Sequence, residues 1–156
     1  MATSFDTIYE RALFKFKDRS FLKYTDELKD LTMKNYLLSA VVDFQHSCKT
    51  PLTYSEVTTE SPDGAIKYAF DADLQNEEVE ILATGMAFHW LSSKVTASEH
   101  LKNVMHNSDY KSFSQGAMLK ELKELRAQVR SEYDSKIKTY SFRYSDLANL
   151  SPNRGA

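Results

Sequence analysis

The stretch that decides the fold is NEEVEILATGMAFHWLSSKV, residues 76–95. Asn76 is expected to cap a helix, because its side chain can accept a hydrogen bond from a free first-turn amide, and Glu77 and Glu78 suit the positive end of the helix dipole. Apolar residues then cover most of the circumference; they are Val79, Ile81, Leu82, Ala83, Met86, Phe88, Trp90 and Leu91. A helix that is apolar nearly all round must be wrapped by other elements, so this one is predicted to form the core.

Two residues of this helix carry further expectations. Gly85 lies in its middle and costs roughly 1 kcal/mol of helix propensity relative to alanine, which suggests that a neighbouring backbone passes close there. Trp90 is the largest side chain on the helix. We therefore expect it to be buried in the core and not to belong to a site.

The length and composition are those of a single domain. A chain of 156 residues can bury a sizeable core and needs no disulfide. Cys48 is the only cysteine and is interpreted as a small buried hydrophobe rather than a reactive thiol. No apolar run reaches the roughly 20 residues of a membrane span. No basic segment followed by an apolar one opens the chain, so we expect no signal peptide, no membrane and a reducing compartment.

Charge is unevenly placed along the chain, although the net charge is only -2. Residues 54–80 contain eight acidic side chains against Lys67, and residues 117–143 contain seven basic side chains against four acidic ones. Such asymmetry suggests complementary surfaces or a charged partner. Two ordinary solvated faces are the alternative.

Two helices are expected before the central one. Ser4 can cap a helix whose apolar positions recur at helical spacing through residues 5–16. Thr25 can cap a second helix over residues 28–48, although Thr32 could restart that helix after a short turn. Pro51 ends it, because proline lacks an amide donor and disfavours helix in the residue before it.

A β-hairpin is predicted over residues 52–70. Residues 52–57 and 66–70 alternate in polarity, and Pro62-Asp63-Gly64 between them is typical of a turn. An isolated two-stranded hairpin is marginal in water, so it should lean on the helices or on a partner. Residues 58–65 are expected to be mobile in the free protein and to become ordered on assembly.

Three features are expected after the central helix. Thr96-Ala97-Ser98-Glu99 has the form of a capping box and predicts a separate short helix. Ser114 is expected to begin a last long helix. Its narrow apolar stripe consists of Met118, Leu122, Leu125, Val129, Tyr133, Ile137 and Tyr140. The alternation of Tyr140, Phe142 and Tyr144 predicts an extended segment thereafter.

The predicted fold class is mainly α. We expect a small bundle of four to five helices over residues 1–141, including the hairpin at 52–70, and an extended C-terminal tail over residues 142–156.

No arrangement typical of catalysis or metal binding is visible. The histidines His46, His89, His100 and His106 lack the spacing of a helical metal pair, and no second cysteine exists. The acids Glu77, Glu78 and Glu80 are explained by the first turn of a helix. No nucleophile elbow or phosphate-binding loop occurs. We expect no catalytic, metal or cofactor site, and no enzymatic activity.

The last helix also admits a nucleic-acid interpretation. Its basic residues could contact phosphates; they are Lys120, Lys123, Arg126 and Arg130. Glu121 and Glu124 interrupt this patch, and the sequence pI is about 6.1. Sequence-specific DNA recognition is therefore disfavoured.

Taken together, these patterns resemble the head–tail connector (adaptor) proteins of long-tailed bacteriophages. The resemblance covers most of the chain as loose patterns of common residue types. The residues that carry it are 5–13 (FDTIYERAL), Leu74 with 77–83 (EEVEILA), Gly85-Met86, Trp90-Leu91, 110–114 (YKSFS), 119–122 (LKEL), Leu125-Arg126 and Tyr140-Ser141.

The resemblance implies a structural protein of the virion neck. Such proteins form a ring, commonly of twelve copies, which docks beneath the portal protein, extends the channel for double-stranded DNA and receives the next neck or tail-completion protein. No catalytic residues and no cofactor carry over. The hairpin region varies between relatives, so its correspondence is open.

Three groups of residues receive expected roles in such a ring. Contact with the portal or a neighbouring subunit is expected from Tyr140, Phe142, Tyr144, Leu147 and Leu150, with Tyr144 and Leu147 as anchors, although the tail could instead fold back on its own bundle. The basic subunit face is Lys120, Lys123, Arg126 and Arg130. The channel or acidic face is Glu56, Glu60, Asp63, Asp71 and Asp73. A head-to-tail ring requires two unlike faces, and these supply them.

A second class of function remains open from the sequence. A helical interaction or regulatory module that binds a protein partner or nucleic acid would have the same composition. Co-assembly with portal protein separates the two, because only an adaptor should show it.

Overall fold

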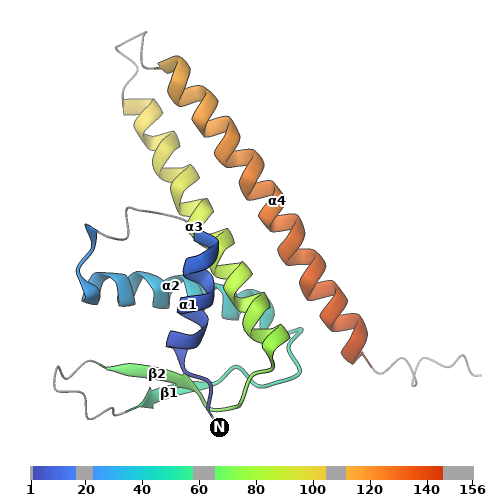
Figure 1. Cartoon of the computed structure of the whole chain (residues 1–156). Coiled ribbons are helices and arrows are strands. Elements are labelled where there is room, and N and C mark those ends of the chain that lie inside the picture. The colour runs from blue at the N-terminus through green and yellow to red at the C-terminus, as the bar shows by residue number, and fades with distance from the viewer. Residues whose placement is uncertain (1, 17–22, 58–65, 105–111, 146–156) are drawn as a thin grey trace, which may run out of the picture.

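The chain folds as a small helical bundle with an inserted hairpin (Figure 1). The computed structural model describes residues 2–16, 23–57, 66–104 and 112–145. In these ranges the elements are α1 (Phe5–Phe16), α2 (Asp26–Phe44), β1 (Tyr54–Val57), β2 (Lys67–Phe70), α3 (Asn76–Val104) and α4 (Ser112–Tyr144). The prediction of a mainly α fold with an inserted β-hairpin is confirmed.

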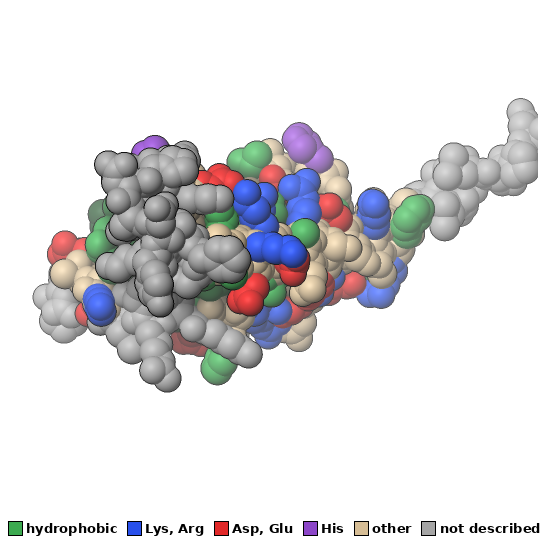
Figure 2. All heavy atoms as spheres, turned by 90° about the horizontal axis from the view of Figure 1, so that it is seen from above, with side chains coloured by type: hydrophobic (Ala, Val, Ile, Leu, Met, Phe, Trp, Pro, Cys, Tyr) green, Lys and Arg blue, Asp and Glu red, His purple; other side chains and the backbone are tan. Residues whose placement is uncertain are grey.

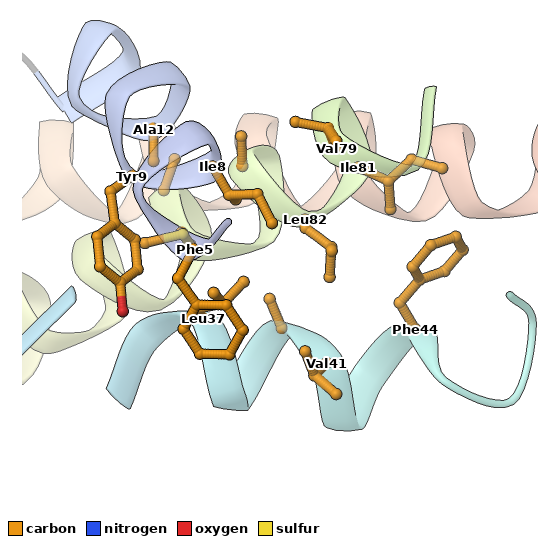
Figure 3. Packing of buried hydrophobic residues seen from close by; sticks show 14 of the residues in the cluster. Phe5, Ile8, Tyr9, Ala12, Leu37, Val41, Phe44, Val79, Ile81 and Leu82 are labelled. Atoms are coloured by element: carbon orange, nitrogen blue, oxygen red, sulfur yellow. The ribbon is translucent and has the colours of Figure 1, made fainter. Parts of the chain in front are cut away.

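The two long helices, α3 and α4, run antiparallel and are the longest elements of the bundle (Figure 1). Helices α1 and α2 pack against the first half of α3, and the hairpin lies at the base beside the start of α1. Figure 3 shows side chains from α1, α2 and α3 meeting in the space between these helices. The central position predicted for α3 is therefore confirmed: Val79, Ile81, Leu82 and Met86 are buried on different sides of it.

The start of α3 differs from the expectation in its capping residue. The Val79 amide donates to the carbonyl of Gln75 at 3.0 Å, and the Gln75 amide donates to Glu78 Oε2 at 2.8 Å. A carboxylate three residues into a helix can reach back to the cap amide in this way. Gln75 is thus the cap residue, and the role expected for Asn76 is wrong.

The separate short helix expected after Thr96 is also wrong, because α3 continues to Val104. The hydroxyl of Thr96 donates to the carbonyl of Ser92 at 3.0 Å, one helical turn earlier. A threonine inside a helix can bond back to the preceding turn, and this contact replaces the predicted capping interaction.

The first two helices begin as predicted. Ser4 Oγ accepts from the Asp6 amide at 3.2 Å at the start of α1. Thr25 Oγ1 accepts from the Leu28 amide at 3.4 Å, and α2 begins directly after it. Thr32 lies inside α2, with its hydroxyl donating to Leu28 O at 2.7 Å, so the alternative restart at Thr32 does not occur. Helix α2 ends at Phe44, a turn earlier than expected.

The hairpin leans on α1, as expected. Its antiparallel register pairs Tyr54 with Phe70 at one end and Val57 with Lys67 at the other. The Phe70 amide also donates to Thr3 O at 2.8 Å, which ties the chain before α1 to β2. The ring of Phe5 lies 5.4 Å from that of Tyr54 and 4.8 Å from that of Phe70. The prediction about residues 58–65 lies outside the described residues.

The end of α4 corrects the predicted boundary of the tail. The helix continues to Tyr144, so residues 142–144 are helical and the expected division at 141/142 falls inside α4. On a helix the three aromatic residues diverge: the side chain of Tyr140 is 1% exposed and that of Phe142 is 69% exposed. Residues 146–156, the rest of the predicted tail, lie outside the described residues.

Gly85 lies where α2, α3 and α4 come together. An ideal Cβ built on Gly85 would lie 2.6 Å from Tyr133 Oη and 2.8 Å from Ala40 Cβ. The expectation of a close neighbour is confirmed, but the nearest atoms belong to side chains and not to backbone. Trp90 was expected in the core, yet it is only partly buried and stacks on Phe16 with ring centroids 5.1 Å apart.

Candidate functional site

A buried polar cluster joins the start of α3 to the end of α4. The Glu78 side chain is completely buried. Its Oε1 accepts from Tyr140 Oη at 2.6 Å, from Thr50 Oγ1 at 2.7 Å and from Cys48 Sγ at 3.5 Å. Its Oε2 accepts from the Gln75 amide. These donors replace the water that the carboxylate loses on burial, so an acid is retained inside the protein.

The titration behaviour of this cluster follows from its contacts. Burial alone raises the pKa of the Glu78 carboxyl, but the hydrogen bonds from Tyr140, Thr50 and Gln75 together hold that pKa below its usual value. Burial and the Glu78 charge raise the pKa of the Cys48 thiol to about 12. Cys48 is therefore protonated at neutral pH, which is the reverse of what a reactive thiol requires.

A second polar group lies beside this cluster, toward α1, and we call the two together the polar seam between α3 and α4. Glu80 Oε1 accepts from Lys15 Nζ at 2.6 Å and from Lys136 Nζ at 3.0 Å, so one carboxylate joins α1, α3 and α4. Two exposed contacts flank it: Arg143 pairs with Glu77 at 2.8 Å, and the Tyr144 hydroxyl donates to Gln75 Oε1 at 2.8 Å. The seam attaches the C-terminal turns of α4 to the rest of the bundle.

Sequence reasoning missed this arrangement. The acids Glu77, Glu78 and Glu80 were explained by the dipole of a first helical turn alone, because their partners are 28 to 66 residues away in the chain. The sequence offered one clue, namely the position of Glu78. It lies between Glu77 and Val79 on a helix that is apolar nearly all round, so little of the helix surface is left for a solvated acid. Among the described residues, no group of three or more His, Cys, Asp or Glu side chains is placed to hold a metal ion.

The residues predicted for portal contact divide into different environments. Tyr140 is buried and bound to Glu78, so its predicted contact role is wrong. Tyr144 is half-buried, with Lys49 lying 5.3 Å from its ring centroid. Phe142 is exposed, so its contact with the portal or a neighbouring subunit stays a prediction. Leu147 and Leu150 lie outside the described residues.

The predicted basic face is partly neutralised within the molecule. Lys123 pairs with Glu99 of α3 at 2.7 Å, and Arg130 pairs with Asp134 at 3.1 Å. In the described part of the chain, Lys120 and Arg126 have no ion-pair partner. Figure 2 accordingly shows basic and acidic side chains interspersed over the upper face.

The predicted acidic face is exposed where the structure describes it. Asp71 accepts from Ser55 Oγ at 2.8 Å, Glu56 from the Tyr68 hydroxyl at 3.3 Å and Asp73 from Thr3 Oγ1 at 3.4 Å. These contacts place the three acids on the hairpin and on the turn after it. Glu60 and Asp63 lie outside the described residues.

Two grooves on the bundle had no counterpart in the sequence analysis. One, of about 400 Å³, lies between α1, α3 and α4 beside Phe16, Trp90 and Leu125. The other, of about 360 Å³, lies between α1 and α2 beside Tyr9, Leu13, Asp30 and Met33. Leu13 was expected in the apolar stripe of its helix but is 46% exposed, since α1 faces α3 with Ile8 and Ala12 instead.

Comparison of the chain with protein-family models, with curated proteins and with solved structures found no match. None of the described helices combines the length and apolar character required to span a membrane.

Proposed function

We propose that this protein is a head–tail adaptor of a long-tailed bacteriophage, a structural component of the virion neck. In this role, about twelve copies form a ring beneath the portal protein, extend the DNA channel and receive the next neck or tail-completion protein. The DNA passes without sequence recognition, and the role requires no catalytic residue and no cofactor.

The main support for the proposal is that the segments of the chain that resemble adaptors contact one another in the folded protein. Arg11, from the first segment, donates to the carbonyl of Asn76 at 3.3 Å, directly before the second segment. Tyr140, from the last segment, donates to Glu78 in the second. Residues scattered over the sequence thus form one contact region, as expected when they maintain a common architecture.

Exposed apolar side chains also support a subunit that works in an assembly. Phe14 is 83% exposed, and Met118 and Phe142 are also exposed. Single exposed apolar residues are ordinary on a folded chain, and in the proposal these side chains are covered by neighbouring subunits or by the portal.

The distribution of charge is compatible with head-to-tail packing. Glu56, Asp71 and Asp73 belong to the hairpin region, and Lys120 and Arg126 belong to α4. A heterologous interface joins two unlike faces and closes into a ring when the rotation between copies permits it. In the proposal these residues contribute to subunit contacts or, for the acids, to a channel lining that repels phosphates.

The test is co-assembly with the portal protein of the phage that carries this chain. The purified proteins are mixed, and the mass of the complex is measured by sedimentation velocity and native mass spectrometry, with the major capsid protein of the same phage as the control. We expect a complex with several copies of this chain per portal ring. Antibody labelling of virions should mark a single vertex. Separate sedimentation of the two proteins, with no labelled vertex, would sink the proposal and favour the interaction-module alternative.

A further inference from the structure

The groove between α1 and α2 has an apolar floor and an exposed apolar edge. Both helices pack against α3, and the space of about 360 Å³ left between them is bounded by side chains of α1 and α2. Tyr9 and Met33 are buried at its floor, and Leu13 is exposed at its edge. Toward β2 the groove continues past Leu31 and Ile66, both of which are exposed.

The groove carries two carboxylates without an ion-pair partner in the described ranges. Of its charged side chains, Asp6 pairs with Lys67 at 3.1 Å and Lys29 pairs with Asp26 at 3.4 Å. Lys34, at the end next to β2, lies over the ring of Tyr68, 3.5 Å from its centroid. The remaining two, Glu10 on α1 and Asp30 on α2, are exposed and both line the groove. A ligand for this groove should therefore combine an apolar side chain with a positive charge.

The outward face of α4 has that chemistry. Ser131, Ser135, Lys138 and Phe142 follow one another at i, i+4, i+7 and i+11, and all four are exposed. In the described residues, Lys138 has no ion-pair partner. The serines are small and let another backbone approach closely. We name these four residues the α4 stripe.

The groove and the α4 stripe cannot meet within one molecule. The groove is lined by α1 and α2, whereas the stripe is exposed on α4, which packs against α3. Two complementary surfaces at different places on a subunit join copies head to tail, which generates a ring or an open filament.

We propose that the groove between α1 and α2 binds the α4 stripe of a second copy of this chain. Lys138 of one copy lies between Glu10 and Asp30 of the next, and Phe142 packs against Leu13 and Met33. This contact is part of the subunit interface of the ring, so the inference rests on the proposed function for its biological role.

The test uses two variants that each disable one half of the contact. The groove variant is Glu10→Gln with Asp30→Asn, and the stripe variant is Lys138→Gln with Phe142→Ala. All four positions are exposed, so both variants should melt as the wild-type chain does. In low salt, without portal, the wild-type chain should form oligomers that grow with concentration in sedimentation velocity. Each variant alone should self-associate at least about 10-fold more weakly, a loss of about 1.4 kcal/mol.

Mixing the two variants is the decisive measurement. One partner keeps an intact stripe and the other an intact groove, so an equimolar mixture should form 1:1 dimers and nothing larger. The control variant, Glu27→Gln with Val42→Ala, neutralises an exposed acid and truncates an exposed apolar residue outside both surfaces; it should assemble as the wild type does.

Three results would overturn the inference: a wild-type chain that stays monomeric up to about 1 mM in low salt, a groove or stripe variant that assembles normally, or a mixture that stays monomeric. The outcome is separable from the proposed function, because portal is absent. Binding to portal by both variants with unchanged stoichiometry would leave the adaptor role intact and reject this interface. Self-association without portal binding would do the reverse.

Discussion

At the scale of single residues, Glu78 is the side chain whose environment constrains the molecule most. A buried carboxylate is stable only when donors satisfy it, and Glu78 receives them from Thr50, Gln75 and Tyr140, three different parts of the chain. Removing one partner from such a network leaves the others unsatisfied, at about 1–3 kcal/mol for each buried group. The cluster therefore makes the position of α4 on α3 specific.

The first prediction concerns the acid response of Glu78. Its folded-state pKa is below the ordinary value of 4.5, so its stabilising contribution is present above that value and is lost as the pH falls through the folded-state pKa. We expect Glu78→Gln to lower the free energy of unfolding at pH 7 by about 1–3 kcal/mol. It should also flatten the loss of stability in acid, leaving a smaller slope from Glu80, whose pKa is lowered too.

Urea unfolding from pH 3 to 7 measures this effect. Glu77→Gln is the matched control, because its ion pair with Arg143 is exposed and should be worth at most about 1 kcal/mol. If the free energy of unfolding falls with decreasing pH as steeply in Glu78→Gln as in the wild type, the buried carboxylate is not the titrating group.

The second prediction compares two helical glycines. Replacing a helical glycine by alanine where a Cβ has open space should stabilise by up to about 1 kcal/mol, as expected for Gly116, where a Cβ would meet no atom within 4 Å. At Gly85 the same change places a Cβ against Tyr133 and Ala40, and the overpacking should cost about 1–3 kcal/mol. Thermal unfolding should show Tm falling for Gly85→Ala and rising for Gly116→Ala. A gain in both variants would mean that α4 moves away freely.

At the scale of elements, the hairpin depends on α1. Its two strands are short, and β1 is exposed along its whole length, so it contributes little core of its own. Phe5 supplies the attachment, since its ring contacts Tyr54, Tyr68 and Phe70 on both strands. Three close ring pairs contribute about 0.5–1.5 kcal/mol each beyond the area that they bury.

The third prediction is that Phe5→Leu loosens the hairpin more than the helices. The substitution keeps an apolar side chain in place but removes the ring pairs, so the bundle should still fold. Amide hydrogen exchange at residues 54–57 and 67–70 should accelerate relative to residues 79–91. Phe14→Leu, at an exposed position of the same helix, is the control and should leave exchange unchanged. Equal acceleration in the hairpin and in α3 would show instead that Phe5 stabilises the whole core.

At the scale of the whole molecule, the bundle is unevenly supported along its length. The lower half of α3 is covered by α1, α2 and α4, whereas α3 and α4 extend upward beyond the other helices (Figure 1). Val95 and Leu119 are buried in this extension, which also has the exposed Lys123–Glu99 ion pair. A helix pair with little buried apolar surface should open at a lower free energy than the core.

The fourth prediction is a gradient of exchange protection along α3 and α4. Residues 96–100 and 118–124 should exchange through local opening, and residues 79–91 and 129–140 only through global unfolding. Native-state exchange in increasing urea measures the two classes, which should merge only near the unfolding midpoint. Uniform protection along both helices would show that the extension is as stable as the core. Assembly into a ring should raise protection in the segments that the ring covers.

The sequence by itself determined those features whose causes are local. Helical periodicity, the alternation of the hairpin strands and the caps at Ser4 and Thr25 depend on residues within a few positions of one another. The nearly continuous apolar surface of residues 79–91 required a central helix, because such a surface cannot face water from any direction. The class of fold followed from these features together.

Tertiary structure decided what depends on residues far apart in the chain. Tyr140, Phe142 and Tyr144 alternate like a strand, and aromatic residues favour strands, yet the segment is helical and Tyr140 bonds to Glu78, which lies 62 residues away. The same contact satisfies Glu78 inside the protein, whereas the sequence explained this acid by the helix dipole alone. Burial of distant partners outweighs local preferences that amount to about 1 kcal/mol or less per residue, so neither the seam nor the groove between α1 and α2 could be read from spacing alone.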